Sequence, residues 1–230
     1  MMTLPATHDD PSPSRWVRPE VKAQAALILE DVQRRAVIAE DDRVTALAPP
    51  KTAYLLELAL TRKPARVLEI GLGWGFSAAG LQSLGCVRQH VIVEFDVGSA
   101  RATQAERNVR AISPRPESLE LCWGDSHRVL PRLCDRGEQF DLIFIDGGHR
   151  YDDVFVDFHY SRRLAAAGAS VVLDDTWLPA IRTVARWVET NLADQWRRLH
   201  APSGLSLAAF ESLAVPDSRR WDHFMPFVVG

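Results

Sequence analysis

The chain has 230 residues, of which 47% are hydrophobic and 25% charged, and its formal net charge is −3. These values are typical of a globular protein with one large domain and an appendage. The net charge is small and basic residues form no block, which argues against a nucleic-acid-binding surface. No uncharged apolar run approaches the roughly 18 residues that a membrane span needs. We therefore expect neither nucleic acid nor a membrane among the partners.

Cys86, Cys122 and Cys134 stand in no spacing that is typical of a metal site, so we interpret them as reduced thiols. Residues 1–16 lack the basic and then apolar pattern of a signal peptide. Both observations favour a cytoplasmic protein. The sequence leaves the oligomeric state open, and a homo-oligomer is compatible with it.

Three segments follow one another along the chain. Residues 1–18 are rich in proline and poor in apolar residues, which predicts a mobile N-terminal arm. Residues 19–62 carry apolar residues at helical spacing, and Pro49-Pro50 is suited to begin a second helix. We expect these two helices to form a lid. Residues 63–230 alternate between strand and helix patterns and form the predicted catalytic domain.

Short apolar segments separated by helical ones predict a mostly parallel α/β sheet with helices on both faces. The expected strands are 65–70, 90–95, 118–123, 140–146 and 169–173. The expected helices are 76–84, 97–111, 127–135, 151–167 and 179–191. Residues 195–200 and 205–211 flank Pro202-Ser203-Gly204 and predict an antiparallel C-terminal hairpin. With this hairpin the predicted sheet is a Rossmann-like one of seven strands.

A glycine-rich turn, Glu69-Ile70-Gly71-Leu72-Gly73-Trp74-Gly75-Phe76, follows the first predicted strand. Such a turn lets the backbone approach a ligand closely. Phe76 stands where a dinucleotide fingerprint requires its last glycine, which disfavours a pyrophosphate site. The pattern E-x-G-x-G-x-G instead resembles motif I of class I methyltransferases that use S-adenosylmethionine (SAM). The resemblance implies that Glu69, Gly71, Gly73 and Gly75 belong to a SAM site, and a tight turn without a ligand is the alternative.

Two further turns are candidates for the same cofactor site. Glu94 ends the second predicted strand 23 residues after Gly71, where a carboxylate can accept hydrogen bonds from both ribose hydroxyls. Asp125 and Ser126 follow the third strand, beside the adenine in the family that the glycine turn resembles. Either residue is equally suited to cap the helix that begins near His127, and one residue can do both.

Three carboxylates follow the fourth and fifth predicted strands: Asp146, Asp174 and Asp175. Because both strands open at the carboxyl edge of a parallel sheet, these side chains can converge on one point. Three unpaired carboxylates that close together repel one another, and a hard divalent cation such as Mg²⁺ relieves this repulsion. Helix capping by Asp174 and Asp175 ahead of Pro179 is the alternative.

The segment FDLIFIDGGHRYDDVFVDF together with VVLDDTW resembles the metal-dependent O-methyltransferases, both the catechol and the macrocin type. The resemblance covers roughly residues 64 to 190. It implies that Asp146, Asp174 and Asp175 hold Mg²⁺ or another divalent cation, with Asp146 also adjoining SAM. It further implies that His149, three residues after Asp146, is the catalytic base. Two other roles for His149 stay open, namely a further metal ligand and a cap for the helix at Tyr151.

The predicted function is therefore transfer of a methyl group from SAM to a hydroxyl of a small molecule, such as a sugar, a catechol or a natural product. A metal-independent methyltransferase and a non-catalytic SAM-binding protein are the alternatives. A nicotinamide-dependent dehydrogenase on the same type of sheet is disfavoured by Phe76 and by the acidic cluster.

Overall fold

The structure is a computed structural model that describes residues 18–38 and 49–229. The predicted mobile arm lies outside the described residues except for Arg18. Residues 39–48, between the two predicted lid helices, also lie outside them.

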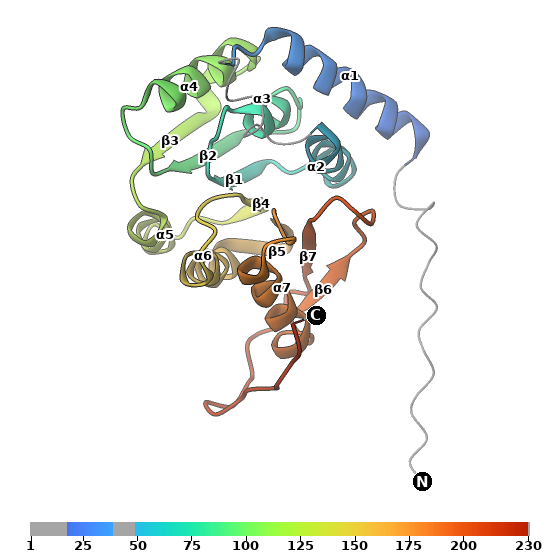
Figure 1. The fold of residues 1–230 in the computed structure, drawn as a ribbon, viewed down its shortest axis with the longest axis vertical. Coiled ribbons are helices and arrows are strands. Elements are labelled where there is room, and N and C mark those ends of the chain that lie inside the picture. Colours follow the sequence, from blue (N-terminus) through green and yellow to red (C-terminus); the bar gives the residue numbers. More distant parts are fainter. Residues whose placement is uncertain (1–17, 39–48, 230) are drawn as a thin grey trace.

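Seven strands form a single sheet in the order β3-β2-β1-β4-β5-β7-β6, as Figure 1 shows. The strands from β3 to β5 in this order are parallel, and β7 runs antiparallel to both β5 and β6. The predicted Rossmann-like sheet with an antiparallel C-terminal hairpin is thus confirmed. The strand bounds are β1 Arg66–Ile70, β2 Gln89–Glu94, β3 Leu119–Trp123, β4 Phe140–Ile145, β5 Ala165–Leu173, β6 Trp196–Leu199 and β7 Ala208–Ser212.

Helices cover both faces of the sheet. Helices α1 to α4 pack together on one face, and α5, α6 and α7 pack side by side on the other (Figure 1). The helix bounds are α1 Pro19–Arg35, α2 Pro49–Arg62, α3 Phe76–Gln82, α4 Ala100–Ile112, α5 Ser126–Asp135, α6 Tyr151–Leu164 and α7 Pro179–Asn191. A 3₁₀ turn, η3, spans Pro116–Ser118 ahead of β3.

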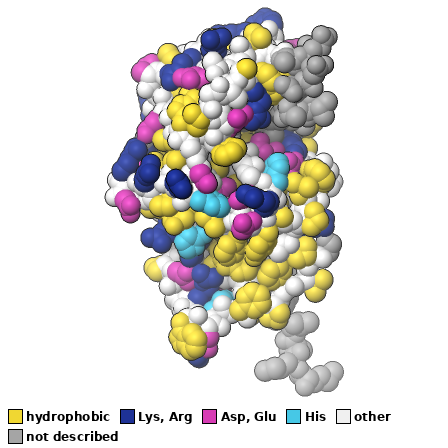
Figure 2. Space-filling model, turned by 60° about the vertical axis from the view of Figure 1, so that its left-hand side comes forward, with side chains coloured by type: hydrophobic (Ala, Val, Ile, Leu, Met, Phe, Trp, Pro, Cys, Tyr) yellow, Lys and Arg dark blue, Asp and Glu magenta, His cyan; other side chains and the backbone are white. Residues whose placement is uncertain are grey.

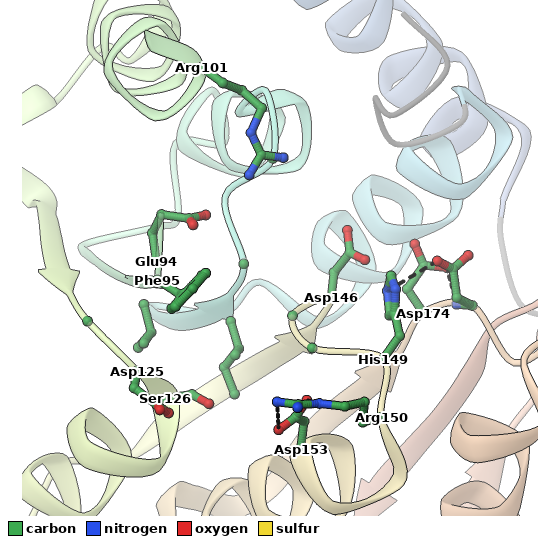
Figure 3. Close-up of a pocket in the computed structure, with 18 of the residues that line it drawn as sticks. Glu94, Phe95, Arg101, Asp125, Ser126, Asp146, His149, Arg150, Asp153 and Asp174 are labelled. Carbon is green, nitrogen blue, oxygen red and sulfur yellow. Dashed lines mark hydrogen bonds and ion pairs between the residues drawn. The ribbon is translucent and has the colours of Figure 1, made fainter. Parts of the chain in front are cut away.

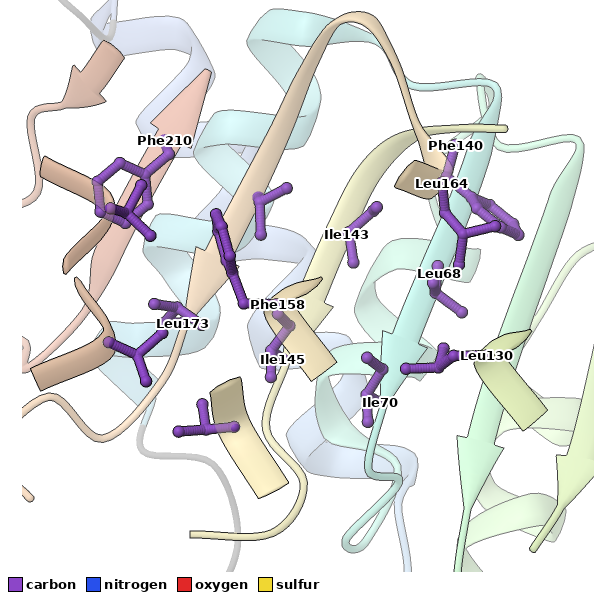
Figure 4. Close-up of a cluster of buried hydrophobic side chains, with 14 of the residues drawn as sticks. Leu68, Ile70, Leu130, Phe140, Ile143, Ile145, Phe158, Leu164, Leu173 and Phe210 are labelled. Atoms are coloured by element: carbon purple, nitrogen blue, oxygen red, sulfur yellow. The ribbon is translucent and has the colours of Figure 1, made fainter. Parts of the chain in front are cut away.

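The core divides into layers because successive side chains of a strand point to opposite faces. Leu68 and Ile70 of β1 pack under α5 and α6, whereas Val67 packs against α2 and α3. Figure 4 shows the first of these layers, in which Phe158 and Phe210 fill the space between α6 and the hairpin. Burial on both faces explains why the central strands are continuous apolar runs.

Several boundaries differ from those expected by one to four residues, and three of them have a clear physical cause. Strand β5 begins at Ala165, and α6 ends at Leu164 instead of 167. Three alanines at 165–167 favour a helix locally, but pairing of Ala165 with Phe140 of β4 overrides that preference. Strand β7 begins at Ala208 instead of 205, because Ser206 adopts a φ of +55° and its carbonyl accepts a hydrogen bond from the Thr176 N–H.

After β7 the chain continues without helix or strand to residue 229 and packs on α7. The Asn191 side chain makes two hydrogen bonds to the Met225 backbone, at 2.7 and 3.0 Å. Trp221 and Phe224 of this segment are exposed. On the face in Figure 2, hydrophobic side chains gather in the lower half, and acidic and basic side chains are interspersed above them. Among the described residues, no helix is long and apolar enough to span a membrane, and all three cysteines are free thiols.

Candidate functional site

A cavity of about 690 Å³ lies at the carboxyl ends of the parallel strands. The chain runs outward from β1 to β2 and β3 on one side and to β4 and β5 on the other, and ligands bind at such a reversal of strand order. Figure 3 shows two groups in this cavity. Glu94, Asp125 and Ser126 lie on the side of β2 and β3, and Asp146, His149 and Asp174 lie on the side of β4 and β5.

The glycine turn after β1 joins these two groups. Gly71 has a φ of +95°, and a Cβ atom at this position would lie 2.1 Å from the carbonyl oxygen of Asp146. Gly73 lines the cavity, and a Cβ atom at this position would have no other atom within 4 Å. Gly75 precedes α3 and lies away from the cavity, where a Cβ would lie 2.8 Å from Cγ2 of Val109. The turn therefore requires glycine at 71 for its approach to β4 and at 75 for its packing on α4.

The carboxylate of Glu94 fixes the turn from the neighbouring strand. Its Oε2 accepts a hydrogen bond from the Leu72 N–H at 2.8 Å, and its Oε1 accepts one from the Asp96 N–H at 2.7 Å. The side chain is buried and lines the cavity. An ionised carboxylate has about four lone-pair sites, so Glu94 retains acceptor capacity for a ligand hydroxyl.

Asp125 and Ser126 also line the cavity. Oδ1 of Asp125 accepts a hydrogen bond from the His127 N–H at 2.9 Å, which makes Asp125 the N-cap of α5. The capping role expected from the sequence is present, and the residue is placed to contact a ligand as well. Arg101 of α4 reaches the same side of the cavity, where it forms an ion pair with Asp96 at 3.1 Å.

Glu69 points away from the cavity. Its carboxylate is buried below the glycine turn, where it accepts a hydrogen bond from the Ser77 hydroxyl and lies 3.2 Å from Nε2 of His90. Glu69 and Gly75 thus do not line the cavity, unlike the other residues that the sequence assigned to the cofactor.

The acidic side of the cavity holds the residues that the sequence proposed for a metal. Ligand atoms of Asp146, His149 and Asp175 all lie within 4.8 Å of one another. Nε2 of His149 is 3.4 Å from Oδ2 of Asp175, and the imidazole is about half exposed. The N-cap position of α6 belongs to Arg150 and no side chain caps it, so a cap formed by His149 is not observed.

Lys51, in the first turn of α2, is a residue on the acidic side of the cavity that the sequence did not reveal. Its Nζ donates hydrogen bonds to Oδ1 of Asp174 at 2.5 Å and to Oδ1 of Asp175 at 2.6 Å. Asp175 has a φ of +54°, and its Oδ1 also accepts from Nε1 of Trp177 at 3.0 Å. Pro49-Pro50 marked the start of the helix, but no local signal showed where its third residue points.

Burial and mutual repulsion govern the protonation of these groups. Burial, with the negative charges of Asp174 and Asp175, raises the pKa of Asp146 well above its usual range. Burial also raises the pKa of Asp174, and the Lys51 ammonium only partly opposes it. For Asp175 the same burial is outweighed by the hydrogen bond and charge of Lys51, which leave its pKa lowered. Lys51 therefore compensates negative charge more fully at Asp175 than at Asp146.

The order of the sheet, the glycine turn and the cavity at the switch point define a Rossmann-like methyltransferase fold. Residues 68–176 match a family model described as a methyltransferase domain, which confirms the class I methyltransferase domain predicted from the sequence. The O-methyltransferase hkm8 of Aspergillus hancockii is 25% identical over 157 residues, which are 68% of this chain. The match spans only 58% of that relative's length.

Solved structures show the same fold. The O-methyltransferase TomG from Streptomyces achromogenes, solved in complex with SAM, superposes with a TM-score of 0.60 at 22% identity. This match covers 86% of the present chain and 92% of TomG. An O-methyltransferase from Bacillus cereus gives a TM-score of 0.55 at 15% identity and covers 85% of this chain and 91% of its own. At these identities the likeness establishes the fold.

A buried carboxylate, Asp157 of α6, lies beneath the turn that carries Gly147. Its Oδ2 is 3.5 Å from where a Cβ of Gly147 would lie. Burial raises the pKa of Asp157 to about 6, against the opposing effects of the Ser126 hydroxyl and of His127. Because this pKa lies above the value of 3.8 for an unperturbed aspartate, the ionised form destabilises the folded state, and its cost appears as the pH rises through about 4 to 6.

Replacement of Asp157 by asparagine should therefore stabilise the protein at pH 7.5, by up to about 3 kcal/mol. The gain should shrink as the pH falls towards 4, where the native carboxyl of the wild type is protonated. Urea unfolding at several pH values measures the effect, with Asp152→Asn, an exposed acid of the same helix, as the control. A variant less stable than the wild type at pH 7.5 would show that the carboxylate makes a required interaction.

Proposed function

We propose that the protein is a SAM-dependent O-methyltransferase that acts on a hydroxyl group of a small molecule with the help of a divalent cation. The acceptor class is a sugar, a catechol or a related natural product. One observation carries the proposal: the groups suited to SAM and the acidic group with His149 line opposite sides of one cavity. This adjacency is what direct transfer between two bound reactants requires.

SAM, when bound, supplies the methyl group, and the residues on the side of β2 and β3 would hold it. The glycine turn offers backbone that can contact the cofactor closely at Gly73. Glu94 keeps lone pairs for ribose hydroxyls, and Asp125 and Ser126 border the end of the cavity expected to receive the adenine. Position 76 is phenylalanine, whereas a pyrophosphate-binding fingerprint has glycine there. This difference agrees with a ligand that lacks phosphate.

The acidic side fits a divalent cation. Asp146 is partly buried. The Lys51 ammonium donates its hydrogen bonds to Asp174 and Asp175, so it does not relieve the repulsion of Asp146 by these two carboxylates through a hydrogen bond. Oxygen donors are the ligands that Mg²⁺ prefers. Asp146 and Asp175 would hold the cation, with Asp174 beside them. A bound cation supplies positive charge that lowers the pKa of a nearby acceptor hydroxyl. Half-exposed His149 faces the cavity beside Asp175, where its imidazole can take up the proton of the acceptor.

Binding of SAM and of NAD to the purified protein separates the proposed cofactor from the nicotinamide alternative. Calorimetry should show micromolar SAM binding and weaker or no binding of NAD. Glu94→Ala should weaken SAM binding by about 1.5–3 kcal/mol, the contribution of hydrogen bonds to a charged group. Glu117→Ala, at an exposed glutamate within the turn η3, is the control. Preference for NAD would contradict the proposed cofactor.

Methyl transfer from labelled SAM to a panel of sugar, catechol and polyketide hydroxyls tests the reaction. We expect transfer to at least one acceptor, loss of transfer on chelation, and recovery with Mg²⁺. Asp146→Asn should reduce transfer by roughly 10²-fold and leave SAM affinity nearly unchanged, whereas the exposed-site control Asp135→Asn should change neither. Full turnover after thorough chelation would favour a metal-independent methyltransferase, and SAM binding without transfer to any acceptor would favour a non-catalytic protein.

Removal of the His149 imidazole tests the proposed base with the acceptor found in that panel. His149→Ala should lower kcat by roughly 10²–10⁴ with little change in SAM or cation affinity. His223→Ala, at an exposed histidine of the C-terminal segment, should behave as the wild type. Loss of cation affinity would instead assign His149 as a ligand, and turnover near that of the wild type would exclude it as the base.

A further inference from the structure

The ammonium of Lys51 sits among the carboxylates proposed for the cation. It bridges Oδ1 of Asp174 and Oδ1 of Asp175, and only 16% of the lysine side chain is exposed. A lysine that is largely buried between two carboxylates interacts with them more strongly than a surface lysine would, because solvent screens the charges much less. Lys51 therefore supplies positive charge where the acidic side of the cavity needs it.

The geometry places this charge in competition with a cation. Asp175 belongs both to the lysine pair and to the cluster with Asp146 and His149 whose ligand atoms lie within 4.8 Å of one another. The single charge of Lys51 neutralises part of the repulsion among the three acids. A divalent cation on the same carboxylates would face Lys51 as a like charge, and like charges at such short range repel strongly.

We propose that Lys51 is a built-in counter-cation that competes with the divalent cation for Asp175, so that cation binding displaces the lysine from this carboxylate. This inference rests on the divalent site of the proposed function. Lys51 lies in α2, outside the residues 68–176 that match the methyltransferase domain. Cation loading is thereby linked to the contact between the helical N-terminal segment and the catalytic sheet.

Cation affinity of a lysine variant tests the competition. Calorimetric titration with Mn²⁺ should show binding to Lys51→Met about tenfold tighter than to the wild type, the equivalent of about 1.4 kcal/mol. Lys22→Met removes an exposed lysine of α1 and should leave Mn²⁺ affinity unchanged. Equal or weaker Mn²⁺ binding to Lys51→Met would overturn the competition, and weaker binding would show that the lysine shapes the site for the metal.

A second measurement uses the wild-type protein and does not depend on the folding of the variant. The chain has only three lysines, Lys22, Lys51 and Lys63, so ¹³C-lysine labelling gives one side-chain NMR signal set for each. Addition of Mg²⁺ should shift the Lys51 signal and leave the other two in place. An unmoved Lys51 signal while calorimetry detects Mg²⁺ binding would overturn the inference alone. Failure of both proteins to bind either metal would overturn the inference and the proposed cation site, while SAM binding would still be tested separately.

Discussion

The close contact between the turns after β1 and β4 is the constraint on which the site depends. Gly71 lies so near the Asp146 carbonyl that a side chain there would overlap the backbone. This contact brings the start of the glycine turn against the residue that carries the first carboxylate of the acidic group. Glu94 then ties the turn to β2 through the Leu72 N–H. One backbone approach thus sets the distance between the two halves of the cavity, and the remaining side chains are arranged around it.

Accumulated negative charge is the second determinant. Asp146, Asp174 and Asp175 are held together by strand ends whose positions the buried core fixes, so the carboxylates cannot move apart to relieve their repulsion. The Lys51 ammonium neutralises part of this charge. Lys51 belongs to a helix that precedes residues 68–176, the part of the chain that matches the methyltransferase domain. Burial keeps the remaining charge costly at Asp146. The same imbalance that raises the pKa of Asp146 supports the cation site that we propose.

Much of the fold and part of the site could be predicted from local sequence signals. The end of a strand and the turn after it are encoded by residues that are adjacent in the sequence. Glu94, Asp125 and Asp146 were therefore expected at one edge of the sheet, where they lie. The sequence did not show to which side of the glycine turn the Glu69 side chain points. In the structure it points below the turn, where it accepts a hydrogen bond from the Ser77 hydroxyl. Lys51 lies 123 residues before Asp174 along the chain, and only the packing of α2 brings them together. Long-range contacts of this kind leave no pattern in one sequence.

In the proposed function, one cavity holds SAM on the side of β2 and β3 and a divalent cation on the side of β4 and β5. A crystal structure of the protein grown with S-adenosylhomocysteine and Mn²⁺ tests it most directly, because Mn²⁺ is located by its anomalous signal. We expect the ribose at Glu94, the adenine beside Asp125, and an anomalous peak between Asp146 and Asp175. Cofactor bound elsewhere, or Mn²⁺ absent from these carboxylates with the cofactor in place, would contradict it.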